Sequence, residues 1–397
     1  MRILIPVFFH APMGGLHYHV LASIRYLKEA GHDITVVCKS GPFAEQATEL
    51  GAHVFLTEFT SEDIHRLLLD LAHYKFDVVY AHPFHSRQIG LTVAEVQQIP
   101  FVLVIHGMYD DDLSYYVDQT SHVIAVSDSI ADYLSERCEK LEGKMTVLMN
   151  GVDERYMPTP LPPKAERLRA VYVARMDADM IFPLDVLLDG VGDEQLKEVP
   201  IDWTFIGSGT QQEKYKARFE EKIRGSNQSI NWIGWQETDD VVAWMKRSDF
   251  VVAPSRVAIE SLALGRPTIA IGSKGYHGLV TTETWEAAEA TNFGGIGTRA
   301  ASYEAGMVAE EILKLCDFEY RSEIAEFSGT LGVRYRDTVI QSRLLQLLEE
   351  VVEADVVPSP INYAVARYEQ LHLHRANNLL AQRLADRERK LQKRHQS

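Results

Sequence analysis

Two series of short apolar runs, each run followed by a segment of helical period, constrain the fold of this 397-residue chain more than any other feature. The first series contains "RILIPVFF", "DITVVCKS", "DVVYAHP", "PFVLVIHG" and "SHVIAVS", and the second contains "RAVYVAR", "IDWTFIGSG", "INWIG", "DFVVAPS" and "PTIAIG". Continuous β-branched runs that alternate with amphipathic helices are typical of parallel sheets covered by helices on both faces. The sequence therefore predicts an α/β protein with two Rossmann-like domains.

The proline-rich stretch "MPTPLPPK" at residues 157–164 separates the two series, and it predicts a stiff, extended linker. The chain also exceeds the size at which one hydrophobic core stops growing. We predict a first domain over residues 1–156, a second over 157–335, and C-terminal helices over 336–397 that partly return to the first domain. Ligands in such sheets bind beyond the carboxyl ends of the strands, so a cleft between the two domains is expected.

Composition and charge exclude several functions. No segment contains the roughly 20 consecutive apolar residues that a membrane-spanning helix needs. The formal net charge of -16 opposes binding to nucleic acid. The three cysteines (Cys38, Cys138 and Cys316) have no paired spacing, and the start of the chain lacks a signal-peptide pattern. These features predict a reduced, cytoplasmic protein. The histidine pairs "LHYH" and "LHLH" come without further ligands at suitable spacing, so no metal site is predicted.

The C-terminal segment 361–397 has the pattern of a long helix with a basic end. Its apolar positions are Leu371, Leu379, Leu380 and Leu384. Three interpretations stay open: a solvated helix, self-association with another subunit, or peripheral contact with the inner face of a membrane.

Three residues at strand ends are candidate ligand contacts in the first domain. Gly14 and Gly15 open the first helix, where glycines let backbone N–H groups approach an anion. A plain strand-to-helix turn explains the same two glycines. His106 ends a buried strand, and it either faces the cleft or belongs to the core.

The second domain offers Arg175 in the loop after its first strand, where a guanidinium suits phosphate oxygens. Gly207 and Gly209 follow the next strand in "FIGSGTQQ". A glutamine stands where the dinucleotide-binding fingerprint has its third glycine, so an NAD site is not favoured.

The stretch "VVAPSRVAIESLALGRP" carries more specific information. The strand 249–253 ends at Pro254, and we expect a helix from about Val257 whose N-terminus points into the cleft. Glu260 then lies near the first turn. A carboxylate there either accepts hydrogen bonds from the paired hydroxyls of a ribose or merely complements the helix dipole.

Taken in order, the motifs resemble those of GT-B glycosyltransferases of the retaining family 4 type, over residues 1 to about 350. The matching motifs include "MGGLHYHVLASIRYLKEAGHDITVV", "PFVLVIHG", "HVIAVSDSI", "VYVARMD" and "ESLALGRPTIA". The resemblance implies a metal-independent hexosyltransferase that works in bacterial polysaccharide or glycoconjugate synthesis. It implies no cofactor: a nucleotide-diphosphate sugar is the co-substrate. The hydroxyl acceptor, which could be a saccharide, a lipid-linked saccharide or a small molecule, is not identified.

The resemblance also implies roles for matching residues. Gly14 and Gly15 would line the phosphate and acceptor side, and His106 would contact the donor sugar. Arg175 would bind the diphosphate and Glu260 the ribose. Base recognition would depend on the surroundings of Gly207 and Ile233, while Gly209 belongs to the same donor-side loop.

Two departures from the family pattern affect the donor site. The family lysine that partners the arginine on the diphosphate is replaced by Met180. Only residues 256–259 separate Ser255 from Glu260, so the first family glutamate and its loop are absent. We hypothesise that Arg256 replaces the lysine. Lys274 and His277, in "GSKGYHGLV", are further donor-site candidates, although a flexible surface loop explains them equally well.

Two other functions stay open from the sequence. A GT-B nucleotide-sugar epimerase would need acid and base carboxylates, of which the shortened loop supplies fewer. A non-catalytic GT-B subunit that serves as a binding partner would explain the missing lysine and glutamate.

Overall fold

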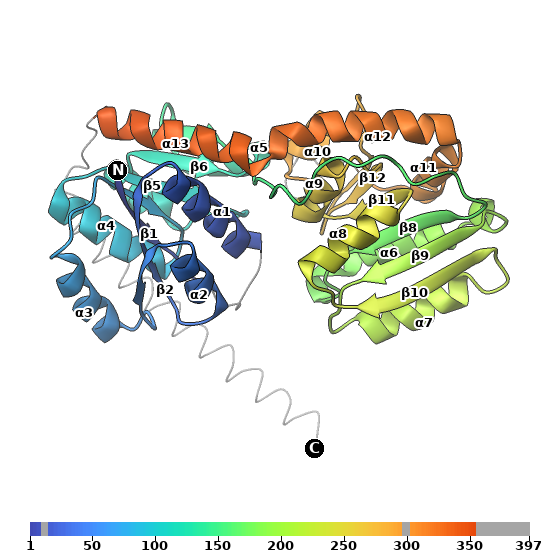
Figure 1. Ribbon diagram of the computed structural model, residues 1–397, viewed down its shortest axis with the longest axis horizontal. Coiled ribbons are helices and arrows are strands. Elements are labelled where there is room, and N and C mark those ends of the chain that lie inside the picture. The colour runs from blue at the N-terminus through green and yellow to red at the C-terminus, as the bar shows by residue number, and fades with distance from the viewer. Residues whose placement is uncertain (9–14, 296–301, 355–397) are drawn as a thin grey trace, which may run out of the picture.

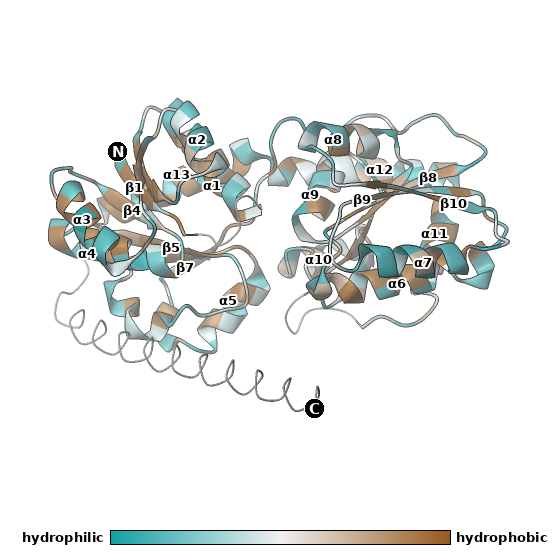
Figure 2. Ribbon diagram, turned by 90° about the horizontal axis from the view of Figure 1, so that it is seen from below, coloured by the Kyte–Doolittle hydropathy of each residue, from teal (hydrophilic) through white to brown (hydrophobic). Residues whose placement is uncertain are grey.

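The computed structural model describes residues 1–8, 15–295 and 302–354, arranged as two α/β domains side by side (Figure 1). Gly14 and the helix predicted over 361–397 lie outside the described residues. Both sheets consist mostly of apolar strands between helices whose outer faces are hydrophilic (Figure 2). The described part of the chain contains no helix that combines the length and the apolar character needed to cross a bilayer.

The first domain is built on a seven-stranded parallel sheet in the order β3-β2-β1-β4-β5-β6-β7. Its strands are β1 (Arg2–Pro6), β2 (Asp33–Cys38), β3 (His53–Leu56), β4 (Val78–Ala81), β5 (Phe101–Ile105), β6 (His122–Ala125) and β7 (Met145–Val147). Its helices are α1 (Gly15–Glu29), α2 (Pro42–Glu49), α3 (Ser61–Leu71), α4 (His85–Gln97) and α5 (Asp128–Ser135). The strand order reverses between β1 and β4, which is where ligands bind in doubly wound sheets.

The second domain contains a six-stranded sheet in the order β10-β9-β8-β11-β12-β13. Its strands are β8 (Leu168–Val173), β9 (Ile201–Ile206), β10 (Gln228–Gly234), β11 (Phe250–Ala253), β12 (Thr268–Ile271) and β13 (Tyr276–Leu279). Its helices are α6 (Ile181–Val191), α7 (Gln212–Lys222), α8 (Thr238–Arg247), α9 (Ser255–Ala263), α10 (Trp285–Ala290), α11 (Met307–Leu315) and α12 (Phe318–Gly332).

Strand β13 differs from the sequence-based expectation. Residues around His277, interpreted as a glycine-rich or flexible surface loop, form a buried strand that pairs antiparallel with β12. Gly278 adopts a φ of 71°, and the register shifts beside it. The segment "YHGL" does not predict a strand, because it is short and contains a glycine.

The chain crosses between the domains twice, and the two crossings hydrogen-bond to each other. The Val152 N–H donates to the Tyr335 carbonyl at 2.7 Å, and the Asp337 N–H donates to the Val152 carbonyl at 2.8 Å. Helix α13 (Asp337–Glu353) then lies along the first domain, continuing the line of α12 (Figure 1). Its buried residues Ile340, Leu344, Leu348 and Val351 belong to the core of the first domain. The exact domain boundaries stay a prediction.

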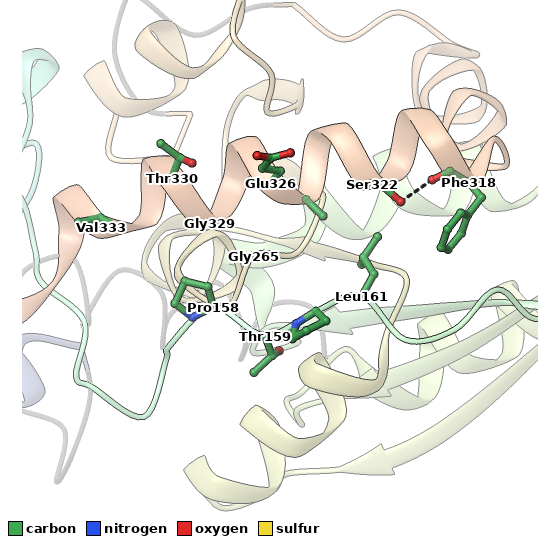
Figure 3. A pocket seen from close by; sticks show the side chains of 12 residues that line it. Pro158, Thr159, Leu161, Gly265, Phe318, Ser322, Glu326, Gly329, Thr330 and Val333 are labelled. Carbon is green, nitrogen blue, oxygen red and sulfur yellow. Dashed lines mark hydrogen bonds between the residues drawn. The ribbon is translucent and has the colours of Figure 1, made fainter.

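The proline-rich segment is fixed to the second domain by the side chain of Arg266. The buried guanidinium of Arg266 donates hydrogen bonds to the Thr159 carbonyl (2.9 Å), the Thr159 hydroxyl (2.7 Å) and the Pro160 carbonyl (3.1 Å). Burial lowers the pKa of Arg266 to about 10. A largely apolar cavity of about 690 Å³ separates this segment from α12 (Figure 3).

Candidate active site between the domains

The N-termini of α1 and α9 approach each other across the space between the domains. A Cβ atom placed on Gly15, the first residue of α1, would lie 3.9 Å from the Arg256 Cδ. The Arg256 guanidinium also lies 5.8 Å from the centre of the Tyr18 ring on α1. The positive ends of two helices and one guanidinium therefore meet at this point, a combination that favours anions.

Arg256 and Glu260 form an ion pair one helical turn apart in α9. Arg256 Nε donates to Glu260 Oε1 at 2.9 Å, and both side chains are largely buried. Burial raises the pKa of Glu260, although Arg256 acts in the opposite direction. Arg256 Nη1 is buried and has no hydrogen-bond partner among the described residues. A buried donor without a partner is destabilising, so this nitrogen is available to a ligand oxygen.

Tyr156 is a further member of this pair that the sequence did not reveal. Its hydroxyl hydrogen-bonds to Glu260, and burial together with that carboxylate raises the pKa of Tyr156. The ring is buried where the chain crosses to the second domain. Linker residues give no periodic signal, so no pattern pointed to this tyrosine.

Helix α9 begins at Ser255, two residues before the predicted start near Val257. Ser255 has a φ of 45°, which L residues with side chains rarely adopt. Its N–H donates to the Phe293 carbonyl at 2.8 Å, and this bond holds the unusual turn. Strained backbone of this kind gathers at functional sites because the surrounding structure must enforce it.

Three histidines cluster at the carboxyl ends of the first sheet. His82 follows β4 and His106 follows β5, and their rings stack with His82 Nδ1 and His106 Nε2 3.1 Å apart. His19 of α1 lies with its ring centre 5.0 Å from that of His106, and its Nε2 is 3.1 Å from the Tyr80 hydroxyl. His106 therefore lies at the carboxyl edge of the sheet, against His82 and α1, and its contact with a ligand stays a prediction.

Burial keeps this histidine cluster uncharged. It lowers the pKa of His19 to about 4, with Arg256 adding to the effect, and it lowers the pKa of His82 and of His106 well below the usual range. The described residues contain no group of three or more potential ligands that could hold a metal ion. Neutral imidazoles of this kind can hydrogen-bond sugar hydroxyls.

Arg175 is not part of the Arg256 cluster in this structure. It is exposed, and its two terminal nitrogens bind Asp177 (3.1 Å) and Asp179 (2.7 Å) in the same loop. Met180, which stands at the position of the family lysine, is buried in the core of the second domain. Arg175 must exchange these carboxylates for a ligand if it is to bind phosphate.

Gly207 and Gly209 have a structural explanation in the packing of two loops. A side chain on Gly207 would collide with the Ala174 carbonyl, and one on Gly209 with the backbone of Met176. Gly207 also has a φ of 126°, and its N–H donates to the Gly234 carbonyl at 2.8 Å beside Ile233. Their role in donor binding stays a prediction.

Lys274 and His277 lie in different surroundings. Lys274 is exposed in the bend before β13. His277 is buried in β13, where its Nε2 lies 2.6 Å from the Thr291 hydroxyl, and burial lowers its pKa to about 4. The His277 ring nitrogen is therefore already occupied by a partner from its own domain.

An ionic network joins the two domains behind the Arg256 pair. Asp153 binds Arg25 of α1 at 3.5 Å and Arg155 at 2.9 Å, and Arg155 reaches Asp239 of α8 at 2.9 Å. A cavity of about 370 Å³ lies beside it, and burial raises the pKa of Asp337 in its wall to about 6. The network ties the orientation of α1 to that of the second domain.

Two facing Rossmann-like domains, with anion-binding helix ends and an arginine between them, have the architecture of GT-B glycosyltransferases. Comparison with known proteins agrees. Residues 13–156 match Glycosyltransferase Family 4, and residues 167–315 match Glycosyl transferases group 1. The chain belongs to the family 4 glycosyltransferases, and it is an enzyme of that class.

Individual similarities are distant but extensive. The chain is 26% identical to the glycogen synthase of Mycobacterium tuberculosis over 68% of this chain and 77% of that protein. A glycosyltransferase from Rickettsia africae superposes with a TM-score of 0.69 at 17% identity, covering 88% of this chain and 98% of the other. Anabaena Alr3699/HepE, solved with UDP and glucose, superposes with a TM-score of 0.61 at 16% identity, covering 88% and 99%.

Proposed function

We propose that this glycosyltransferase moves a hexosyl group from a nucleotide-diphosphate sugar to a hydroxyl acceptor with retention of the anomeric configuration. The observation that carries the proposal is the buried Nη1 of Arg256, which has no hydrogen-bond partner in the described part of the chain and lies between the N-termini of α1 and α9, beside Glu260. The complex of Anabaena HepE with UDP and glucose supports the same class of donor. The reaction fits bacterial polysaccharide or glycoconjugate synthesis in the cytoplasm or at the inner face of the membrane.

Donor binding would use groups that are paired with each other in the structure. The diphosphate oxygens would accept hydrogen bonds from Arg256 Nη1 and from the helix N-termini. The carboxylate of Glu260 would accept hydrogen bonds from the ribose hydroxyls, and the Tyr156 hydroxyl would hold that carboxylate in place. Arg175 would add a second positive charge after leaving Asp177 and Asp179.

Catalysis would depend on stabilising the departing diphosphate. The bond between the anomeric carbon and the diphosphate oxygen breaks as the acceptor oxygen forms its bond on the same face of the sugar. The acceptor proton passes to the diphosphate oxygen. Negative charge grows on the leaving group, and Arg256 with the helix ends would stabilise it without a metal ion. Neutral His106 would orient the sugar, and domain closure would exclude water.

A first experiment tests donor binding and turnover in the wild-type protein. Nucleoside diphosphates and nucleotide sugars with different bases and hexoses are screened for thermal stabilisation and for release of the free diphosphate. We expect at least one donor to raise the melting temperature and to be turned over. If no nucleotide or nucleotide sugar stabilises the protein or is turned over, the proposal is wrong. Conversion of the donor to its epimer without transfer would instead indicate an epimerase.

The same assay then tests Arg256. We expect Arg256→Ala to lower kcat/KM by about a hundredfold, because removing a donor to developing charge loses roughly 3 kcal/mol of transition-state stabilisation. Arg66→Ala is the matched control, because Arg66 forms an exposed pair with Glu62 at the same helical spacing in α3. That control should keep wild-type kinetics. Unchanged kcat/KM in Arg256→Ala would contradict the role of this arginine.

A further inference from the structure

An exposed aromatic side chain stands beside the histidine cluster in a conformation that the surrounding structure must enforce. Phe84 is 46% exposed and lies between β4 and α4, two residues after His82. Its φ of 67° and ψ of -136° belong to a region that residues other than glycine rarely occupy. Burial in the core does not explain this ring, because almost half of its residue surface faces solvent.

A buried ion pair holds Phe84 in this conformation. The Phe84 N–H donates to Asp111 Oδ1 at 3.1 Å, and Asp111 Oδ2 pairs with Arg87 Nη1 at 2.8 Å. Arg87 also donates to the Asp111 backbone carbonyl, and the Tyr116 hydroxyl donates to Asp111 Oδ2 at 3.0 Å. Both charged side chains are at most 6% exposed. The pair thus locks the loop after β4 to the loop after β5.

Tyr109 completes a two-ring surface that leads back to His106. Its ring centre lies 5.0 Å from that of Phe84 at an interplanar angle of 37°. The His106 N–H donates to the Tyr109 hydroxyl at 3.4 Å. Gly107 permits this fold-back, because a Cβ there would lie 2.8 Å from the Tyr109 ring. Both rings therefore sit at the strand edge that carries His82 and His106.

We propose that Phe84 and Tyr109 are the platform on which an unphosphorylated pyranose ring of the acceptor stacks. Aromatic faces are electron-rich and attract the C–H face of a sugar ring, while the hydroxyls of the sugar stay available to polar groups. This assignment rests on the proposed function and names the class of acceptor.

The charges around the platform favour a neutral saccharide over an acceptor that carries phosphate. Asp110 and the exposed Asp112 follow Tyr109 in the same loop, and their carboxylates suit hydroxyl donors but repel phosphate. The guanidinium of Arg87 is already bound to Asp111. A lipid chain is disfavoured for the same reason, since two carboxylates would lose water beside it.

Saturation-transfer NMR tests the platform directly. Methyl α-glucopyranoside, methyl α-galactopyranoside, methyl α-mannopyranoside, their 6-phosphates and octan-1-ol are added to the protein with the nucleoside diphosphate that stabilises it most. We expect transfer to the ring protons of at least one unphosphorylated pyranoside, and weaker transfer to its 6-phosphate and to the alcohol. Phe84→Ala should weaken pyranoside binding about tenfold, and Phe84→Tyr, which keeps the ring, should restore it.

Tyr74→Ala is the matched control, since Tyr74 is a partly exposed aromatic residue after α3 and should leave pyranoside binding unchanged. Equal pyranoside signals in Phe84→Ala and the wild type would overturn the platform. Stronger signals from the phosphates or the alcohol, or no pyranoside signal at all, would overturn it too. The thermal shift caused by the nucleoside diphosphate is measured in the same samples. If that shift is present but no pyranoside binds, the platform is wrong and the proposed function stands. If the shift is absent as well, the proposed function is wrong.

Discussion

At the scale of single residues, the site is governed by how burial sets the charges of its members. Arg256 and Glu260 bind each other, and Arg256 opposes the rise that burial causes in the pKa of Glu260, whereas the histidine cluster beside them is neutral. The arrangement gives one positive group facing the expected diphosphate and uncharged donors and acceptors facing the expected sugar. Charged imidazoles so close to Arg256 would be destabilising, because like charges repel.

The pKa of His19 has a consequence for stability. In the folded protein it lies at about 4, against 6.5 for an ordinary histidine. The unfolded chain therefore binds more protons between pH 6.5 and 4, so this group makes the free energy of unfolding fall as the pH falls through that window. Between pH 7.5 and 4.5 the free energy of unfolding should therefore fall by about 2 kcal/mol less in His19→Gln than in the wild type.

Urea unfolding at both pH values checks this. The variant His65→Gln, at an exposed histidine of α3, should keep the full pH dependence of the wild type. An unaltered pH dependence in His19→Gln would show that His19 is not held neutral by the fold.

Sequence reasoning reached some residues of the site and missed others for identifiable reasons. Arg256 and Glu260 were found because they share one helix with a family motif. His82 carried the same signal as His106, a polar residue directly after a buried strand, and could have been predicted by that rule. His19 and Tyr156 could not, because only the tertiary structure brings α1 and the domain crossing to α9.

At the scale of elements, the alternation of strands and helices was predictable, but local turns were not. Runs of β-branched residues predicted the parallel strands because each is buried on both faces. Strand β13 escaped prediction because it is short and interrupted by Gly278. The early start of α9 escaped prediction because it depends on the Phe293 carbonyl, which is distant in sequence. The positive φ of Ser255 is enforced by that environment rather than by its residue type.

A matched pair of substitutions tests the strain at the start of α9. Ser255→Gly and Ser255→Ala both remove the hydroxyl, but only glycine adopts a φ of 45° without strain. We expect the glycine variant to be the more stable of the two by about 1 kcal/mol in chemical denaturation. The reverse order would mean that Ser255 does not hold this backbone conformation in solution.

At the scale of the whole molecule, the two domains are joined by two chain crossings that bind each other and by the ionic network around Asp153. Because α13 returns to the first domain, two segments of the chain connect the domains instead of one. The backbones of Val152 and Arg336 form an isolated parallel bridge at this junction, and we expect any closure of the domains to turn about it.

The close packing of the two crossings is testable at Gly151. A methyl group there would collide with the Asp337 side chain and lie 3.1 Å from its Cα. We expect Gly151→Ala to lower the free energy of unfolding by about 1–3 kcal/mol, and the melting temperature therefore by several degrees. Adding Asp337→Ala should recover part of the loss by making room. A melting temperature equal to that of the wild type would contradict this packing.

The most direct test of the whole account is a crystal structure with the nucleoside diphosphate that gives the largest thermal shift. We expect the diphosphate between the N-termini of α1 and α9, within hydrogen-bonding distance of Arg256 Nη1, and the ribose hydroxyls on Glu260. A nucleotide bound elsewhere, with its phosphates away from Arg256 and its ribose away from Glu260, would contradict the account.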